Sequence, residues 1–310
     1  YKSILRVLCK KSRFLQKGMV IMAKKIGQFF LSFLPFILVL VLQFIASFFL
    51  TGTAVFVKIL KGGTDFSSVI SSLQNLLSSS DFSSYIMIIY ALLAIAVFGI
   101  WYYLQFYADY LPNVKETFHP LIFVGVIVLV PGSQYLCSYL IAILSAIFPS
   151  WLTQYQELLK NAGMDSNLTF SLLLYSVILA PICEELVCRG VTMSSAKRCM
   201  PFWAANLLQA FLFGLLHMNW LQGSYAFCLG LILGYVCEKS GSIYVSILFH
   251  MLFNFWGTVL EQFIPSDNTV LVIILWILFG VIAPVAGFLL FRLGVRKRDQ
   301  RMLPAGVPIS

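Results

Sequence analysis

Two adjacent glutamates and an arginine lie at the end of a strongly apolar stretch, APICEELVCR at residues 180–189. On a helix, Glu185 and Arg189 are four residues apart and share a face, so we expect an ion pair, whereas Glu184 is turned about 100° away. Pro181 lacks a backbone donor and is expected to kink this helix. An ionisable group inside a membrane helix costs on the order of 3 kcal/mol on insertion scales. The unpaired Glu184 is therefore the candidate for chemistry.

Two histidines and an asparagine complete a small set of polar residues within apolar stretches. His217 follows Phe213 by four residues and His250 precedes Asn254 by four, so each pair shares a helical face. At about 1.5 Å per residue from the nearest cytoplasmic end, Glu184, His217 and His250 lie about 21, 24 and 14 Å along their helices. We therefore expect three helices to bring these residues together at similar depth.

These residue types have the parts that activation of a water molecule requires. A carboxylate can take a proton from water, and an imidazole and an amide one helical turn apart can donate hydrogen bonds to an oxygen that becomes negative. Water would enter through a polar cavity, because the surrounding helices face lipid. Taken singly, an intramembrane histidine is more often a hydrogen bond between helices, and the Glu185–Arg189 pair is more often architectural. Because such bonds average only about 0.6 kcal/mol, the whole set favours a chemical role.

The composition is that of a polytopic membrane protein. Hydrophobic residues make up 60% of the 310, charged residues only 11%, and the mean hydropathy is +0.91, far above the range of a soluble chain. The net charge of +9 does not indicate nucleic-acid binding, because the basic residues lie at the two ends and beside apolar runs. The seven cysteines show no CxxC spacing, so we expect reduced thiols and neither disulfides nor a zinc site.

Eight apolar stretches have about the length that a membrane-spanning helix needs, which predicts an all-α membrane bundle of about eight transmembrane helices. They cover residues 26–56, 85–107, 120–148, 168–187, 202–220, 223–237, 242–260 and 270–291. The sixth of them is short for a hydrocarbon core of about 30 Å. Two amphipathic segments, 62–84 and 151–166, are expected to lie in the membrane interface.

The basic residues predict the orientation of the bundle. With eight spans, every Lys and Arg except Lys58, Lys61 and Lys160 falls on the side of the two termini. Both termini are therefore expected in the cytoplasm. The first apolar stretch is too long for the core of a cleaved signal peptide, so we expect a retained span, with Met19 and Met22 as alternative translation starts.

Three short motifs follow one another in these stretches. Residues 184–189 fit EExxxR, residues 213–217 fit FxxxH, and residues 250–254 fit HxxxN. In this order and membrane setting, the sequence over about 175–256 resembles the CPBP family, the CAAX-prenyl-endopeptidase and bacteriocin-processing or immunity (Abi-like) intramembrane proteins. The resemblance implies an eight-helix glutamyl intramembrane endopeptidase that works without a metal or other cofactor.

The resemblance also implies a role for each motif residue. Glu184 corresponds to the general base and His217 to its partner on the attacking water. His250 and Asn254 correspond to the groups that stabilise the oxyanion. The residues that support them in the motifs are Glu185, Arg189 and Phe213.

The resemblance divides the chain into parts and indicates its partners. The expected parts are a basic cytoplasmic segment (1–25), N-terminal membrane helices with interfacial segments (26–165), the CPBP-like catalytic core (166–292) and a basic cytoplasmic tail (293–310). We expect a multi-pass protein of a bacterial plasma membrane. Its expected partners are the lipid bilayer and a membrane-associated peptide or protein substrate, with no nucleic acid.

Other interpretations stay open. Glu184, His217 and His250 would make a two-histidine, one-carboxylate metal set, although HExxH spacing is missing. Cysteine catalysis through Cys183 or Cys188 would need a histidine near in space, because none is near in sequence. A non-proteolytic scaffold or bacteriocin-immunity protein would keep the motifs for structure. A proton-coupled transporter would be expected to show inverted repeats, and we find none.

Overall fold

The computed structural model describes residues 19–61, 65–77, 79–107, 118–164, 168–264 and 268–302. Every regular element in these ranges is a helix, which confirms the expected all-α class. Most of the predicted basic N-terminal segment, the loop with Lys115 and the end of the predicted tail lie outside the described residues.

The helices follow the apolar stretches of the sequence. In chain order they are α2 (Leu34–Leu60), α3 (Phe66–Leu77), α4 (Ser80–Gln105), α6 (Pro120–Ile147), α7 (Pro149–Asn161), α8 (Phe170–Leu173), η2 (Leu174–Leu179), α9 (Ala180–Glu185), η3 (Leu186–Met193), α10 (Ser194–Lys197), α11 (Phe202–Leu216), α12 (Trp220–Ser240), α13 (Ile243–Phe255), η4 (Trp256–Leu260), η5 (Glu261–Phe263), α14 (Thr269–Ile277), η6 (Leu278–Ile282) and α15 (Ala283–Met302).

Seven helical stretches in the described residues are long and apolar enough to cross a membrane. They are Met19–Leu60, Asp81–Gln105, Pro120–Ile147, Phe170–Lys197, Trp220–Ser240, Ile243–Phe263 and Thr269–Met302. The remaining predicted span is the shorter α11, with 15 residues, whereas α12 has 21, so the expectation that the sixth span is the short one is wrong. Asn219 explains the difference, because its side chain accepts a hydrogen bond from the backbone N–H of Gln222 and begins α12 earlier than the apolar pattern.

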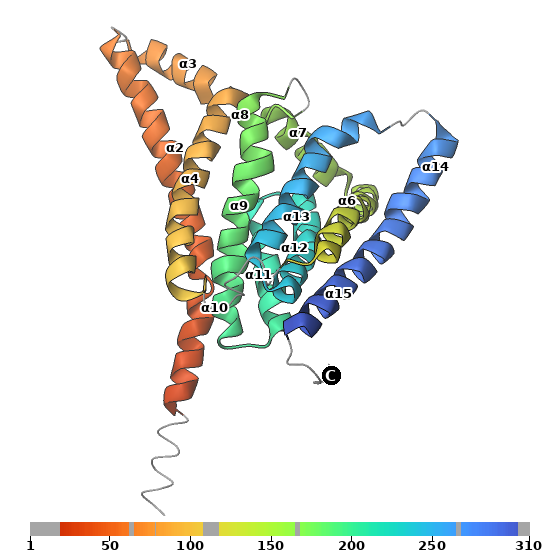
Figure 1. The fold of residues 1–310 in the computed structure, drawn as a ribbon. Helices are drawn as coiled ribbons and strands as arrows, with labels where there is room; N and C mark the ends of the chain where they lie inside the picture. The colour runs from red at the N-terminus through yellow and green to blue at the C-terminus, as the bar shows by residue number, and fades with distance from the viewer. Residues whose placement is uncertain are drawn as a thin grey trace, which may run out of the picture.

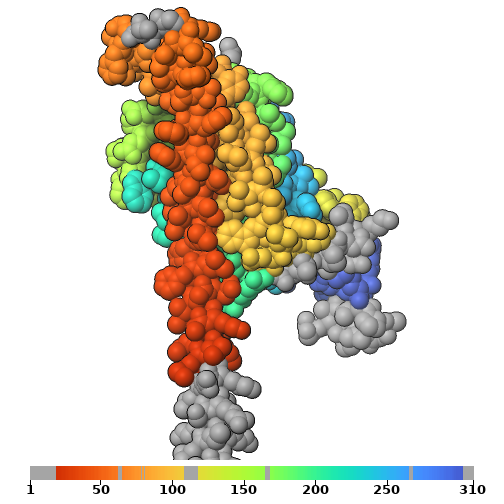
Figure 2. All heavy atoms as spheres, turned by 90° about the vertical axis from the view of Figure 1, so that its left-hand side faces the viewer, coloured from red at the N-terminus to blue at the C-terminus, as the bar shows by residue number. Residues whose placement is uncertain are grey.

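The spans form one bundle, and the first of them lies on its outside (Figures 1 and 2). That helix packs against α4 along one side of the bundle, while α14 and α15 lie at the other side. The start of the first helix and the end of α15 lie at the same end (Figure 1). The amphipathic segments form α3 and α7 near the opposite end. Their place in a membrane interface, and the side on which the termini lie, stay predictions.

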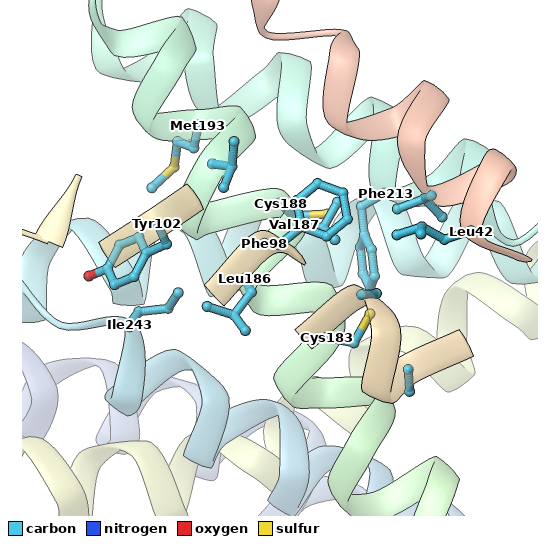
Figure 3. Packing of buried hydrophobic residues seen from close by; sticks show 14 of the residues in the cluster. Leu42, Phe98, Tyr102, Cys183, Leu186, Val187, Cys188, Met193, Phe213 and Ile243 are labelled. Atoms are coloured by element: carbon cyan, nitrogen blue, oxygen red, sulfur yellow. The ribbon is translucent and has the colours of Figure 1, made fainter. Parts of the chain in front are cut away.

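A buried apolar cluster holds the helix with the two glutamates in the bundle. Phe98 and Tyr102 of α4 pack beside Leu186 and Cys188, and Phe213 of α11 approaches from another direction (Figure 3). These side chains are almost completely buried. The position of the glutamates is therefore fixed by packing on several helices.

Small residues bring other helices into backbone contact. A Cβ atom at Gly294 of α15 would lie 2.6 Å from the backbone nitrogen of Ile122 in α6. A Cβ atom at Gly214 of α11 would lie 2.7 Å from the carbonyl oxygen of Gly223 in α12. Close approach at small residues is a common way for membrane helices to associate, because lipid provides no hydrophobic drive between them.

Candidate active site

The two glutamates lie on a continuous helical stretch, Phe170–Lys197, in the middle of the bundle (Figure 1). Its backbone hydrogen bonding changes from π-helical in η2 to α-helical in α9 and back to π-helical in η3. The helix continues through Pro181, and the departures from α-helical geometry lie on both sides of the glutamates. π-helical segments occur frequently at functional sites, where they change the face that a side chain presents.

Glu185 and Arg189 form the predicted ion pair. Arg189 Nη1 lies 2.8 Å from Glu185 Oε1, and both side chains are 0% exposed. Arg189 Nη2 donates a second hydrogen bond to the carbonyl oxygen of Gly230 in α12 at 3.0 Å. The guanidinium also lies over the ring of Phe213, 4.9 Å from its centroid. Arg189 therefore connects its own helix with α11 and α12.

His250 of α13 lies between the two carboxylates. Its Nδ1 is 2.9 Å from Glu185 Oε1, and its Nε2 is 3.5 Å from Glu184 Oε2. A carboxylate oxygen can only accept, so Nδ1 carries the proton in its hydrogen bond with ionised Glu185. This bond directs Nε2 towards Glu184. The sequence analysis expected His217 as the partner of Glu184 on the attacking water, whereas the histidine that contacts Glu184 in the structure is His250.

His217 lies at the end of α11 and contacts Phe213. Its Nδ1 lies 2.9 Å from the carbonyl oxygen of Phe213, which can only accept, so Nδ1 is the donor and Nε2 of the neutral ring is an acceptor. The Phe213 ring meets both imidazoles edge to face, with centroids 4.9 Å from His217 and 5.7 Å from His250. Phe213 therefore packs against both histidines. Among the described residues, His217 forms no hydrogen bond or ion pair with Glu184.

Asn254 connects α13 to the glutamate helix. Its Nδ2 donates a hydrogen bond of 2.8 Å to the carbonyl oxygen of Ser176 in η2. A side-chain amide has a second N–H and a carbonyl oxygen. Asn254 thus has a structural contact and keeps one donor for another partner.

Exposure separates the two glutamates. The side chain of Glu184 is 23% exposed, whereas that of Glu185 is 0% exposed. Glu184 is therefore only partly buried, which agrees with its expected freedom from the buried ion pair of Glu185 and Arg189. In the part of the chain that the structure describes, no group of three His, Cys, Asp or Glu residues is placed to hold a metal ion.

A polar network on α11 was missed by the sequence analysis. Gln209 Nε2 donates to the carbonyl oxygen of Gly230 at 2.9 Å, the same oxygen that Arg189 contacts, and to Asn206 Oδ1 at 2.6 Å. Asn206 Nδ2 donates to the carbonyl oxygen of Leu231 at 3.1 Å. Both polar side chains are completely buried. Gln209 precedes Phe213 by four residues, so the helical period of the FxxxH motif would have identified it.

The architecture defines the class of the protein. An all-α bundle with seven helices of spanning length and a buried polar site is an integral multi-pass membrane protein. Residues 166–256 match the family model described as type II CAAX prenyl endopeptidase Rce1-like, which agrees with the resemblance of this region to the CPBP family. All three motifs lie within the match. Comparisons with curated proteins and with solved structures found no match.

Proposed function

We propose that this protein is a glutamyl intramembrane endopeptidase in which Glu184 activates the attacking water. The observation that carries the proposal is the position of the His250 ring, 2.9 Å from Glu185 and 3.5 Å from Glu184. A buried ion pair thereby orients an imidazole against a carboxylate that is only partly buried. The Rce1-like match supports a CAAX-protease-like protein of the membrane.

The reaction begins with proton transfer from water to Glu184. The oxygen of that water forms a bond with the carbonyl carbon of the peptide, and the carbonyl oxygen takes the negative charge. When the tetrahedral intermediate collapses, the C–N bond breaks and the leaving nitrogen takes the proton that Glu184 received. The family resemblance assigns the second hydrogen of this water to His217, whose Nε2 is an acceptor because its Nδ1 donates to the carbonyl oxygen of Phe213.

His250 and Asn254 stabilise the oxyanion. Because Nδ1 of His250 donates to Glu185, Nε2 can donate to an oxyanion only when the ring is protonated. Because Glu185 is already paired with Arg189, ionised Glu184 balances that charge before the reaction, and the oxyanion balances it after Glu184 has taken the proton. The free N–H of Asn254, one helical turn from His250, is the second donor.

The substrate is a membrane-associated peptide or protein, because the site lies within the spanning helices. We expect both ends of the chain in the cytoplasm, because most basic residues lie on the side of the two termini. Prenylated tails, leader peptides and signalling peptides all belong to this class.

A comparison of peptide profiles tests the proposal. Membranes that carry the wild type are compared with membranes that carry Glu184→Ala, and with a control variant, Glu157→Ala, that removes a carboxylate from α7. Peptides that appear with the wild type and with Glu157→Ala, and disappear with Glu184→Ala, support the proposal. Identical profiles for all three proteins would refute it.

A second candidate function is a non-proteolytic scaffold or immunity protein, and one observation favours it. Asn254 and His250 already connect helices, through Ser176 and Glu185. Residues with a purely structural role would form the same hydrogen bonds between helices. In that case Glu184→Ala would leave both the peptide profile and the co-purification of a partner protein unchanged.

A further inference from the structure

An apolar groove lies between α6, α12 and α15, on the side of the bundle away from α2 (Figure 1). Its volume is about 510 Å³, within the range of small-molecule sites. Side chains such as Leu136, Ile232 and Leu289 line it. The groove lies outside the glutamate site and contributes nothing to the reaction proposed above.

Aromatic side chains gather where the groove approaches the ends of α12 and α15. Trp203 stacks on Tyr235 with centroids 6.1 Å apart, and Phe288 lies 5.9 Å from Tyr235. Arg298 of α15 donates to the carbonyl oxygen of Lys239 at 3.1 Å, which holds the two helix ends together. Tryptophan and tyrosine at helix ends are typical of the boundary between hydrocarbon and headgroups.

Cations follow the aromatic side chains. Arg292 Nη1 donates to the hydroxyl of Tyr235 at 3.0 Å and lies 5.9 Å from the Phe288 ring. One helical turn further, Arg296 follows Arg292 on α15 and Lys239 follows Tyr235 on α12, and all three cations are exposed.

Among the described residues, carboxylates do not neutralise these cations. The neighbouring carboxylates are in other pairs, Glu238 with Lys197 and Asp299 with Arg298. Within the described residues, no carboxylate forms an ion pair with Arg292, Arg296 or Lys239. The groove therefore ends in positive charge that an external anion can neutralise.

We propose that this groove binds an anionic phospholipid from the leaflet at the end where the first helix starts and α15 ends. One acyl chain lies in the apolar groove, its upper part against Trp203 and Tyr235. The phosphate lies on Arg292, with Lys239 and Arg296 beside it. Basic pockets between membrane helices are a known form of lipid recognition, with each Lys or Arg near an anionic surface contributing a factor of about five.

Native mass spectrometry of the full chain tests the site. The protein in detergent is titrated with phosphatidylglycerol and, separately, with phosphatidylcholine of the same acyl chains. We expect preferential binding of phosphatidylglycerol, reduced about fivefold in Arg292→Gln. Lys24→Gln is the matched control, because it removes an equal charge from the first helix on the other side of the bundle (Figure 1).

Two further experiments test whether the groove and the cations together bind one lipid molecule. Leu289→Trp fills the groove and should weaken binding of both lipids, whereas glycerol phosphate in large excess should not displace the bound lipid. Equal binding of the two lipids, or equal losses in Arg292→Gln and Lys24→Gln, would overturn the proposal. Displacement of the lipid by glycerol phosphate would also overturn it, because the cations would then bind a free anion. A change from dimer to monomer in Leu289→Trp with unchanged lipid binding would overturn it as well, because the groove would then bind a second copy of the chain.

Discussion

The buried pair of Glu185 and Arg189 predicts a large loss of stability when its cation is removed. In Arg189→Met, the carboxylate keeps His250 at 2.9 Å but loses the guanidinium at 2.8 Å. Removing one partner of a buried pair typically costs about 3–5 kcal/mol. The lower figure applies here, because His250 remains and because Gly230 keeps a donor in Gln209. We expect a loss of about 3 kcal/mol, or roughly 6–12 °C in Tm.

Buried thiols provide the assay for this prediction. Cys137, Cys183, Cys188 and Cys237 are free and buried, so a thiol-reactive dye reports their exposure as the purified protein is heated. The control is Lys197→Met, which removes a cation from an exposed pair with Glu238, whose side chains are 33% and 23% exposed. Such a pair contributes about 1 kcal/mol at most.

A double variant sharpens the test. Glu185→Leu combined with Arg189→Met removes both charges, so its loss of stability should be smaller than the sum of the two single losses. An Arg189→Met protein that unfolds at the same temperature as Lys197→Met would refute the structural role of the pair. Strictly additive losses in the double variant would refute the coupling.

Three other predictions concern catalysis and packing. Asn254→Leu should lower the cleavage rate about 10²–10³-fold with little change in substrate binding, as loss of one oxyanion donor does; near-normal cleavage would remove Asn254 from that role. Cleavage should survive EDTA and phenanthroline, since the sequence has no HExxH spacing, and a loss that added zinc reverses would favour a metal mechanism. Gly294→Ala should destabilise the protein, because its Cβ would meet the backbone of Ile122, whereas Gly52→Ala, with nothing within 4 Å, should stabilise it by about 1 kcal/mol; equal melting temperatures would contradict the packing of α6 on α15.

The sequence predicted the fold because apolar length and helical period are local properties. Each of the eight apolar stretches is helical over most of its length, and the ion pair of Glu185 with Arg189 follows directly from four-residue spacing. The relative lengths of α11 and α12 were wrong, because the cap at Asn219 is a single side chain inside an apolar pattern. Capping depends on backbone geometry that composition does not reveal.

The partners within the site were harder to predict, because they depend on how helices rotate against one another. From the sequence we expected Glu184 to lie near histidines on two other helices. We did not predict the observed contacts, in which His250 lies against both glutamates. The flanking π-helical segments change which face a residue presents, and the 3.6-residue period does not anticipate them. The hydrogen bond from Asn254 to the carbonyl oxygen of Ser176 could not be predicted either, because every residue has a backbone carbonyl and the sequence does not show which one lies near Asn254.

The most direct test of the central claim is the cleavage rate of purified protein in lipid vesicles, with Glu184→Gln compared with the wild type. The substrate is the peptide that the membrane profiles identify, and Glu157→Gln is the matched control. Glutamine keeps the shape of the side chain and removes its capacity to accept a proton. The proposed mechanism predicts no detectable cleavage by Glu184→Gln at wild-type thermal stability, and a normal rate for Glu157→Gln. Undiminished cleavage by Glu184→Gln would contradict it.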